Sequence, residues 1–271
     1  MKGASSMTST ESKSFVADKV AIITGAGSGF GLLTAQMLKE RGATVVGFDI
    51  HAVQDCVVVD VSDREAVRRA VDDAVIQHGK VDILVNNAGT MPLAFLEDHA
   101  KAAEAWDRCI DVNLKGVLHG ICAAYDHMIR QGGGHIVNIA SIYGIYGVAG
   151  AAVYSATKAA VITLSNALRV EAQGKIKVTT IRPTGVPGTN LLNSVIDINA
   201  AMPLAGHNVS RLQARFSGED SDPDSSNPAS VRYWAITPEE LAQQIVYAID
   251  QPAGVSIADI TVRATGEDFV F

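Results

Sequence analysis

The stretch VAIITGAGSGFGLLTAQMLKERGATVVGFDI, residues 20–50, decides the fold. A short apolar run ends in closely spaced glycines, and a segment with helical periodicity then extends to Gly42. A second apolar run follows at residues 44–50. Strand, glycine turn, helix and strand in this order predict the first unit of a parallel sheet.

The same alternation continues along the chain. Further strand-like runs lie at residues 56–62, 81–89, 132–141, 175–183 and 257–264, and helical patterns lie at 62–79, 101–131, 151–173 and 237–250. The strand-like runs are almost continuously apolar, which is typical of strands covered on both faces. We therefore predict an α/β fold over residues 18–271: a single-domain, Rossmann-type, doubly wound parallel sheet of about seven strands with helices on both faces.

Composition limits the function classes. The chain has 271 residues, 48% hydrophobic and 19% charged, and a formal net charge of −7. It has no global basic surface for nucleic acid or anionic lipid and no apolar run near the ~20 residues of a membrane span. Cys56, Cys109 and Cys122 lack paired or metal-type spacing, so we expect reduced thiols, no metal site and a cytoplasmic location. The polar, Ser/Thr-rich start predicts a disordered leader over residues 1–17.

The glycine turn is the first candidate binding site. It reads Thr-Gly-x-x-x-Gly-x-Gly from Thr24 to Gly31 and differs from the usual Gly-x-Gly-x-x-Gly fingerprint. Glycines let the backbone turn tightly and approach a pyrophosphate, and the following helix directs its N-terminus at the anion. The alternative is a merely flexible turn. The residues expected at the pyrophosphate are Gly25, Gly27, Ser28, Gly29, Phe30 and Gly31.

Asp49 ends the second strand-like run, about 20 residues beyond the glycines. A carboxylate there can accept hydrogen bonds from both ribose hydroxyls and repels a 2′-phosphate. The glycine turn contains no Lys or Arg that would hold such a phosphate. We therefore expect NAD rather than NADP, the alternative being an aspartate that only forms a turn.

Tyr154 and Lys158 form the second candidate site, because residues four apart in a helix share one face. The unperturbed pKa of tyrosine is about 10. A cation ~4 Å away at an effective dielectric of ~20 is worth about 4 kcal/mol, which would lower the phenol pKa by roughly three units. Ser141 ends a strand-like run and can hold a substrate oxygen. Taken alone, Tyr-x-x-x-Lys is common on amphipathic helices, so a catalytic role depends on the other motifs.

Taken together, these motifs resemble the short-chain dehydrogenases/reductases over about residues 19–263. The resemblance implies that Asn113 completes a tetrad with Ser141, Tyr154 and Lys158. It also implies that the Asn-Asn-Ala-Gly run at 86–89 lines the cofactor site and that the Asp-Val pair at 60–61 contacts the adenine. The further cofactor-binding residues implied are Asp60, Val61, Asn87, Ala88, Gly89, Tyr154, Lys158, Pro183, Val186 and Thr189. The exit of the sixth strand departs from the family pattern, because Thr184 stands where glycine is usual.

The implied reaction is hydride transfer between NAD(H) and a secondary alcohol or ketone. Tyr154 exchanges the proton of the reacting oxygen and Ser141 hydrogen-bonds that oxygen. Lys158 lowers the phenol pKa and holds the nicotinamide ribose. Asn113 is expected to hold a water in a proton relay that begins at Lys158.

Residues 190–236 interrupt the regular alternation and are expected to form a substrate lid. The alternative for 217–230 is a solvated surface loop. The candidate substrate residues are Ser141, Tyr143, Tyr154, Leu191 and Leu192, with Val195, Trp234, Ile145 and Tyr146 as further apolar walls. Together they suggest a lipophilic or ring-bearing substrate, although the same side chains could belong to the core or to a subunit interface.

Oligomeric state and two other function classes complete the expectations. Apolar residues on the helices at 101–131 and 151–173, together with the family resemblance, suggest a homodimer or homotetramer. A regulator that senses NAD without turnover remains an alternative, but it would have no need of the Ser, Tyr and Lys set. A nucleotide-sugar epimerase or dehydratase on a related fold is the other alternative. Those enzymes usually carry a longer C-terminal substrate region than this chain has.

Overall fold

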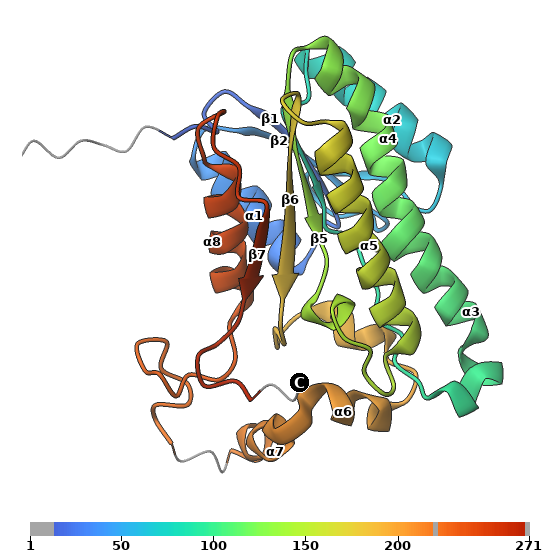
Figure 1. Ribbon diagram of the computed structural model, residues 1–271, viewed down its shortest axis with the longest axis vertical. Helices are drawn as coiled ribbons and strands as arrows, with labels where there is room; N and C mark the ends of the chain where they lie inside the picture. Colours follow the sequence, from blue (N-terminus) through green and yellow to red (C-terminus); the bar gives the residue numbers. More distant parts are fainter. Residues whose placement is uncertain (1–13, 219–221, 269–271) are drawn as a thin grey trace, which may run out of the picture.

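The fold is a parallel sheet of seven strands, counted over residues 14–218 and 222–268, which are the residues that the computed structural model describes (Figure 1). The sheet order is β3-β2-β1-β4-β5-β6-β7, and every neighbouring pair is parallel. The strands are β1 Val20–Thr24, β2 Thr44–Asp49, β3 Cys56–Val58, β4 Ile83–Asn86, β5 Gly134–Ile139, β6 Ile176–Pro183 and β7 Asp259–Val262. The predicted doubly wound sheet is confirmed, with β3 shorter than the expected run at 56–62.

Helices cover both faces of the sheet, as Figure 1 shows. One face carries α1 (Gly29–Glu40) and α8 (Pro238–Ile249); the other carries α2 (Arg64–His78), α4 (Gly116–Arg130) and α5 (Ala152–Glu171). Successive side chains of a strand point to opposite faces. Ile22 of β1 therefore belongs to the core beneath α2, α4 and α5, and Ile23 belongs to the core beneath α1 and α8.

The predicted helix signals account for several helix ends. The side chain of Thr237 accepts a hydrogen bond from the Glu240 amide, and the Glu240 side chain accepts one from the Thr237 amide, which forms a capping box. The side chain of Asp63 caps α2 by accepting hydrogen bonds from the Glu65 and Ala66 amides, and Gly79 ends that helix in the left-handed conformation. No described helix is long and apolar enough to span a membrane.

The helix expected at 101–131 is two α-helices joined by a π-helical turn. Helix α3 (His99–Ile110) continues through the turn at Asp111–Lys115 into α4. The side chain of Asn113, inside this turn, binds the backbone of Thr90 on the loop after β4. π-helical turns arise where a helix accommodates an extra residue, often at functional sites. The long helix expected over this stretch therefore forms, with a π-helical turn at residues 111–115.

The N-terminal boundary of the domain lies earlier than expected. The side chain of Val16 is buried against the core beneath α1 and α8. The amide of Phe15 donates to the Asp250 carboxylate at 2.6 Å. Residues 14–17 are thus part of the folded domain rather than of a disordered leader, while residues 1–13 lie outside the described residues.

The strand order reverses between β1 and β4, and ligands of such sheets bind beyond the carboxyl ends at this point. The segment after β6 lies across these ends (Figure 1). It consists of short elements, η4 Asn190–Ser194, η5 Ile198–Ala201, α6 Met202–Ala205, η6 Gly206–Asn208 and α7 Val209–Ser217. We call residues 190–217 the cover segment.

Candidate active site

A cleft of about 870 Å³ lies beyond the carboxyl ends of the strands. Its walls come from the glycine turn after β1, the ends of β2, β4, β5 and β6, the start of α5, and the cover segment. Most of the expected cofactor residues line it. The exception is Gly27, which does not line the cleft.

The glycine turn has no room for side chains at two positions. A Cβ atom on Gly31 would lie 2.3 Å from the Gly25 carbonyl oxygen, and one on Gly27 would lie 2.8 Å from Asp49 Oδ2. Gly25 has φ +66°, a conformation that glycine adopts without strain. Helix α1 begins at Gly29, so its free amides face the cleft at this turn. This cradle fits the pyrophosphate of a dinucleotide.

The Asn-Asn-Ala-Gly run at 86–89 is bonded to the glycine turn. The hydroxyl of Thr24 accepts hydrogen bonds from the amides of Asn87 and Ala88, each at 3.0 Å. Asn87 Nδ2 in turn donates to the carbonyl oxygens of Thr24 and Gly25 at 2.9 and 3.1 Å. The two motifs, more than sixty residues apart in sequence, therefore form one rigid wall of the cleft.

Two aspartates lie at the other end of this wall. Asp49 accepts hydrogen bonds from the amides of Gly27 and His51, each at 3.0 Å, which fixes its carboxylate beside the glycine turn. Asp60 accepts from Ser62 and from the guanidinium of Arg108 at 2.9–3.0 Å. Burial raises the pKa of Asp60, but these hydrogen bonds outweigh it and hold the pKa below its usual value.

Arg108 is a cleft residue that sequence reasoning missed. It lies on α3, and its partner Asp60 is 48 positions earlier in the chain. No local motif marks an arginine on a helix as a partner for a distant aspartate. Only the packing of α3 against the end of the third strand reveals the pair.

Ser141, Tyr154 and Lys158 come together at the base of the cleft. All three are buried, with 4–5% of their surface exposed. Lys158 Nζ donates to the Ile139 carbonyl oxygen at 2.9 Å and lies 5.7 Å from the centroid of the Tyr154 ring. The Ser141 hydroxyl accepts from the Tyr143 amide at 3.2 Å and lies close enough to the Tyr154 phenol to lower its pKa. The fourth expected residue, Asn113, is fully buried and does not line the cleft.

The protonation states differ from the sequence expectation. Burial raises the pKa of Tyr154 to about 12, and the hydrogen bond with Ser141 offsets only part of that effect. Burial also lowers the pKa of Lys158 to about 8. The expected lowering of the phenol pKa was therefore wrong, because burial of both groups disfavours the phenolate and the ammonium alike.

Asn113 clamps the loop after β4. Its Oδ1 accepts from the Thr90 amide and its Nδ2 donates to the Thr90 carbonyl oxygen, both at 2.9 Å. Nδ2 also lies 3.3 Å from Thr157 Oγ1, next to Lys158 on α5. These contacts occupy the side-chain amide, so the role that they support is to position Thr90 and Gly89 at the cleft.

The cover segment supplies an apolar wall. Of the expected substrate residues, Tyr143, Leu191 and Leu192 line the cleft, whereas Val195, Trp234, Ile145 and Tyr146 do not. Trp234 is buried elsewhere, and Ile145 and Tyr146 are exposed. The lining residues that sequence reasoning missed include Met91, Leu93, Ile198, Met202, Leu204 and Val209. Met91 and Leu93 lie on the irregular loop after β4, and Ile198, Met202 and Leu204 lie on helical turns of four residues, so no periodic pattern marks them in the sequence.

Comparison with known proteins agrees with this geometry. A family model described as short chain dehydrogenase matches residues 19–199. The chain belongs to the short-chain dehydrogenase family. Uncharacterized oxidoreductases of Staphylococcus saprophyticus and Listeria monocytogenes are 32% and 33% identical, each over 93% of this chain and 98% of the relative.

Two solved structures of similar fold are also informative. The closed form of a serine dehydrogenase complexed with NADP+ is 25% identical, with a TM-score of 0.75 over 93% of this chain and 97% of that one. The aldohexose dehydrogenase of Thermoplasma acidophilum in ligand-free form is 25% identical, with a TM-score of 0.73 over 94% and 96%. This short-chain dehydrogenase is therefore an oxidoreductase with a site for a nicotinamide dinucleotide.

Proposed function

We propose that this short-chain dehydrogenase interconverts an apolar secondary alcohol and its ketone with NAD(H). The observation that carries the proposal is the grouping of Ser141, Tyr154 and Lys158 at the base of a cleft whose opposite wall is the glycine turn. A bound nicotinamide dinucleotide would supply or accept the hydride. The protein side chains would bind and orient the substrate and the cofactor, and they would move the proton.

Tyr154 would exchange the proton of the reacting oxygen. With a pKa of about 12 its phenol is protonated at neutral pH, so it can donate a proton to a carbonyl oxygen that becomes an alcohol. In the reverse direction the phenolate would accept the alcohol proton. The Ser141 hydroxyl would hydrogen-bond the same oxygen, and Lys158, largely cationic below its pKa of about 8, would favour the phenolate.

Several residues would hold the cofactor. The glycine turn and the N-terminus of α1 would bind the pyrophosphate, and Asp49 the adenine ribose. Asp60 and Val61 would contact the adenine, while Lys158, Val186 and Thr189 would hold the nicotinamide end. Asp49 supports NAD over NADP, because a carboxylate disfavours a 2′-phosphate. The serine dehydrogenase with NADP+ makes the choice a question for direct measurement.

The cover segment supports an apolar substrate. Among the described residues of this segment, those that line the cleft include no charged side chain. They include Leu191, Leu192, Ile198, Met202, Leu204 and Val209. An apolar wall binds alkyl or ring surface well and leaves a charged group without a partner. Highest efficiency with serine, hexoses or small hydroxy acids in a substrate panel would contradict this part of the proposal.

We also propose a homodimer or homotetramer and a cytoplasmic location. Exposed apolar side chains on α3 and α5, such as Ile110 and Val170, support association. Support for a reducing compartment is the three free cysteines. Sedimentation at micromolar concentration tests the first idea, and localisation of the full-length chain tests the second.

Tyr154→Phe tests the reaction most directly. It removes only the hydroxyl, so we expect NAD+ to bind within about threefold of wild type while kcat/KM falls at least ~100-fold, the lower end of what a general acid or base contributes. Tyr247→Phe on the exposed surface of α8 is the matched control and should leave both unchanged. Activity within tenfold of wild type in Tyr154→Phe would rule out the phenol as the proton donor.

A further inference from the structure

The departure from the family pattern at Thr184 has a partner near the C-terminus. The Thr184 side chain is buried, and its hydroxyl donates to Glu267 Oε2 at 2.6 Å, across 83 positions of sequence. The Gly185 amide makes a longer contact to Glu267 Oε1, at 3.4 Å. The Val262 carbonyl oxygen is a second acceptor within reach of the same hydroxyl, at 3.3 Å. A hydroxyl has one proton, and the shorter, charge-assisted bond to the carboxylate is the stronger.

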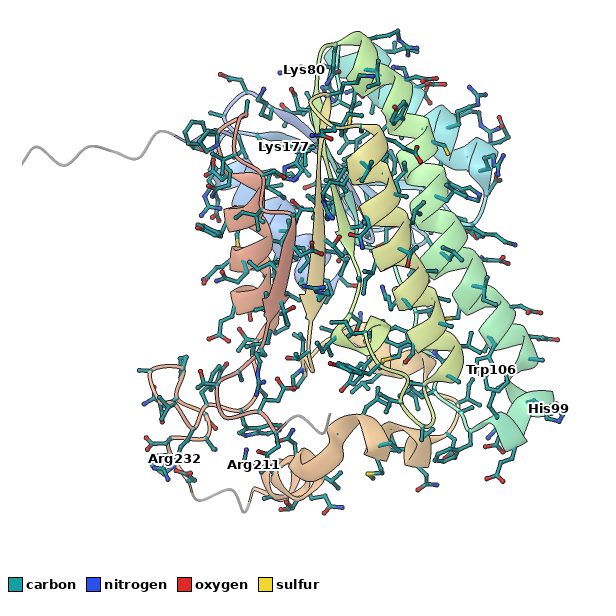
Figure 2. The ribbon with its side chains drawn as sticks, viewed as in Figure 1. Lys80, His99, Trp106, Lys177, Arg211 and Arg232 are labelled. Carbon is teal, nitrogen blue, oxygen red and sulfur yellow. The ribbon has the colours of Figure 1, made fainter. Side chains whose placement is uncertain are left out.

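The segment that carries Glu267 also holds the cover segment. Asn208 bonds to both backbone groups of Asp268, donating to its carbonyl oxygen at 3.0 Å and accepting from its amide at 3.3 Å. The guanidinium of Arg211, on α7, donates to the Gly266 carbonyl oxygen at 2.7 Å. Figure 2 shows Arg211 below the carboxyl ends of the strands, on the side where the chain returns from β7.

Gly266 packs tightly against the stretch before α8. Its amide donates to the Tyr233 carbonyl oxygen at 2.7 Å, and a Cβ atom on it would lie 2.6 Å from the Arg232 carbonyl oxygen. Residues 264–268 are therefore fastened to three separate parts of the chain: the exit of β6, the cover segment and the stretch before α8. We call residues 264–268 the clasp.

The clasp contacts the segments that form two walls of the cleft, and both segments are distant from it in sequence. Pro183, Thr184, Gly185 and Val186 line the cleft beside the catalytic residues, and Val209 and Gln213 of α7 line it from the cover side. Glu267 itself is absent from the lining. It is thus placed to act through the wall that it holds.

We propose that Glu267 is a positioning residue that sets the cofactor-facing wall at Thr184–Val186, and that the clasp couples this wall to the cover segment. The proposal rests on the proposed function, because the wall matters for activity only if a dinucleotide lies against it. Thr184 in place of glycine then has a physical reason: it supplies the hydroxyl that the carboxylate binds.

Glu267→Gln is the first test. The side-chain amide has one acceptor oxygen in place of two and carries no charge, so it cannot accept from both the Thr184 hydroxyl and the Gly185 amide, and no bond that it makes is charge-assisted. We expect the dissociation constant for NAD+, measured by calorimetry, to rise by up to about tenfold, the limit at which the whole value of one charge-assisted hydrogen bond goes into ordering the wall. The KM for NAD+ should rise by a similar factor, while kcat at saturating cofactor stays within about twofold, since Tyr154 and Lys158 are untouched. Glu239→Gln, the same change on the exposed first turn of α8, is the matched control and should alter neither quantity.

A double-mutant cycle and hydrogen exchange complete the test. Thr184→Val should weaken NAD+ binding as Glu267→Gln does, and the double variant should be no weaker than the worse single variant. Amide exchange without ligand should quicken in residues 184–190 and 206–213 of Glu267→Gln.

The outcomes separate the two proposals. Unchanged exchange in Glu267→Gln, or additive effects in the cycle, would overturn the clasp even if the enzyme is an NAD-dependent dehydrogenase. Wild-type protein that binds no dinucleotide would instead remove the proposed function and with it the role of Glu267 in cofactor binding. Faster exchange would in that case still support the clasp as the link between the two walls.

Discussion

Replacing Lys158 by methionine should stabilise the fold while it removes activity. The ammonium is buried, and its pKa falls from 10.5 to about 8. That fall means that burying the charged side chain costs about 3 kcal/mol at neutral pH, at about 1.4 kcal/mol per pKa unit. Methionine has similar length and no charge. Its cost is the Ile139 carbonyl oxygen left without its donor, about 1–3 kcal/mol.

The difference leaves Lys158→Met more stable than wild type by about 0–2 kcal/mol at pH 7. The pH dependence is the sharper part of this prediction. Because the folded pKa lies below the unfolded pKa, the cost is complete below about pH 8 and disappears as the pH rises through 10.5. Between these pH values the unfolding free energy of wild type should therefore rise, relative to that of the variant, by about 1.4 kcal/mol per pH unit.

Urea unfolding of both proteins at pH 7, 8, 9 and 10 measures the difference directly, because the other ionisable groups are common to both. Turnover of Lys158→Met should fall at least ~100-fold at every pH, consistent with a functional group kept at the expense of stability. A variant more than 2 kcal/mol less stable than wild type at pH 7, or a stability difference that stays constant from pH 7 to 10, would refute the reasoning.

Three further changes test the cofactor site and the core. Asp49→Ser removes the charge beside the glycine turn and should raise the ratio of kcat/KM for NADP+ to that for NAD+ at least about tenfold, measured by steady-state kinetics. Gly31→Ala places a methyl group 2.3 Å from the Gly25 carbonyl oxygen, so it should abolish dinucleotide binding in calorimetry and lower stability by about 1–3 kcal/mol, whereas Gly254→Ala, with open space around it, should do neither. Burial lowers the pKa of His135 to about 3, so the folded protein keeps the ring neutral while the unfolded chain is protonated below pH 6.5; between pH 7 and 5 this one group should remove about 2 kcal/mol of unfolding free energy, and that part of the acid dependence should be missing from urea titrations of His135→Gln.

The parts of this enzyme that could be read from sequence are those set by short-range patterns. Alternating apolar strands and amphipathic helices predicted the sheet and the faces that the helices cover. The glycines at 25–31 and the spacing of Tyr154 and Lys158 predicted which side chains meet at the cleft, because a turn and one helical repeat fix those distances locally.

The remaining features depend on contacts between distant segments. Arg108 and Glu267 meet partners 48 and 83 positions away, and nothing near either residue in sequence indicates the partner. The phenol pKa was misjudged because spacing reports the nearness of Lys158 but not the burial that raises the pKa of Tyr154. Up to residue 208 the cover segment forms turns of three to five residues, too short for a helical period to be visible.

The π-helical turn at Asp111–Lys115 sets the rotational phase between two halves of one long rod. Each residue of an α-helix turns the chain by ~100°, so the extra residue decides which sides of α3 and α4 face inward. Upstream, Trp106 Nε1 reaches the Pro92 carbonyl oxygen; downstream, Gly116 lies so close to Val61 that a Cβ atom would be 2.8 Å from its Cγ2. Deleting any one of the five residues would rotate one half against the other by about 100° and turn one of these two contacts away from the domain. The chain can thus tolerate exchanges on the outer side of this rod, but it cannot be shortened there by a single residue.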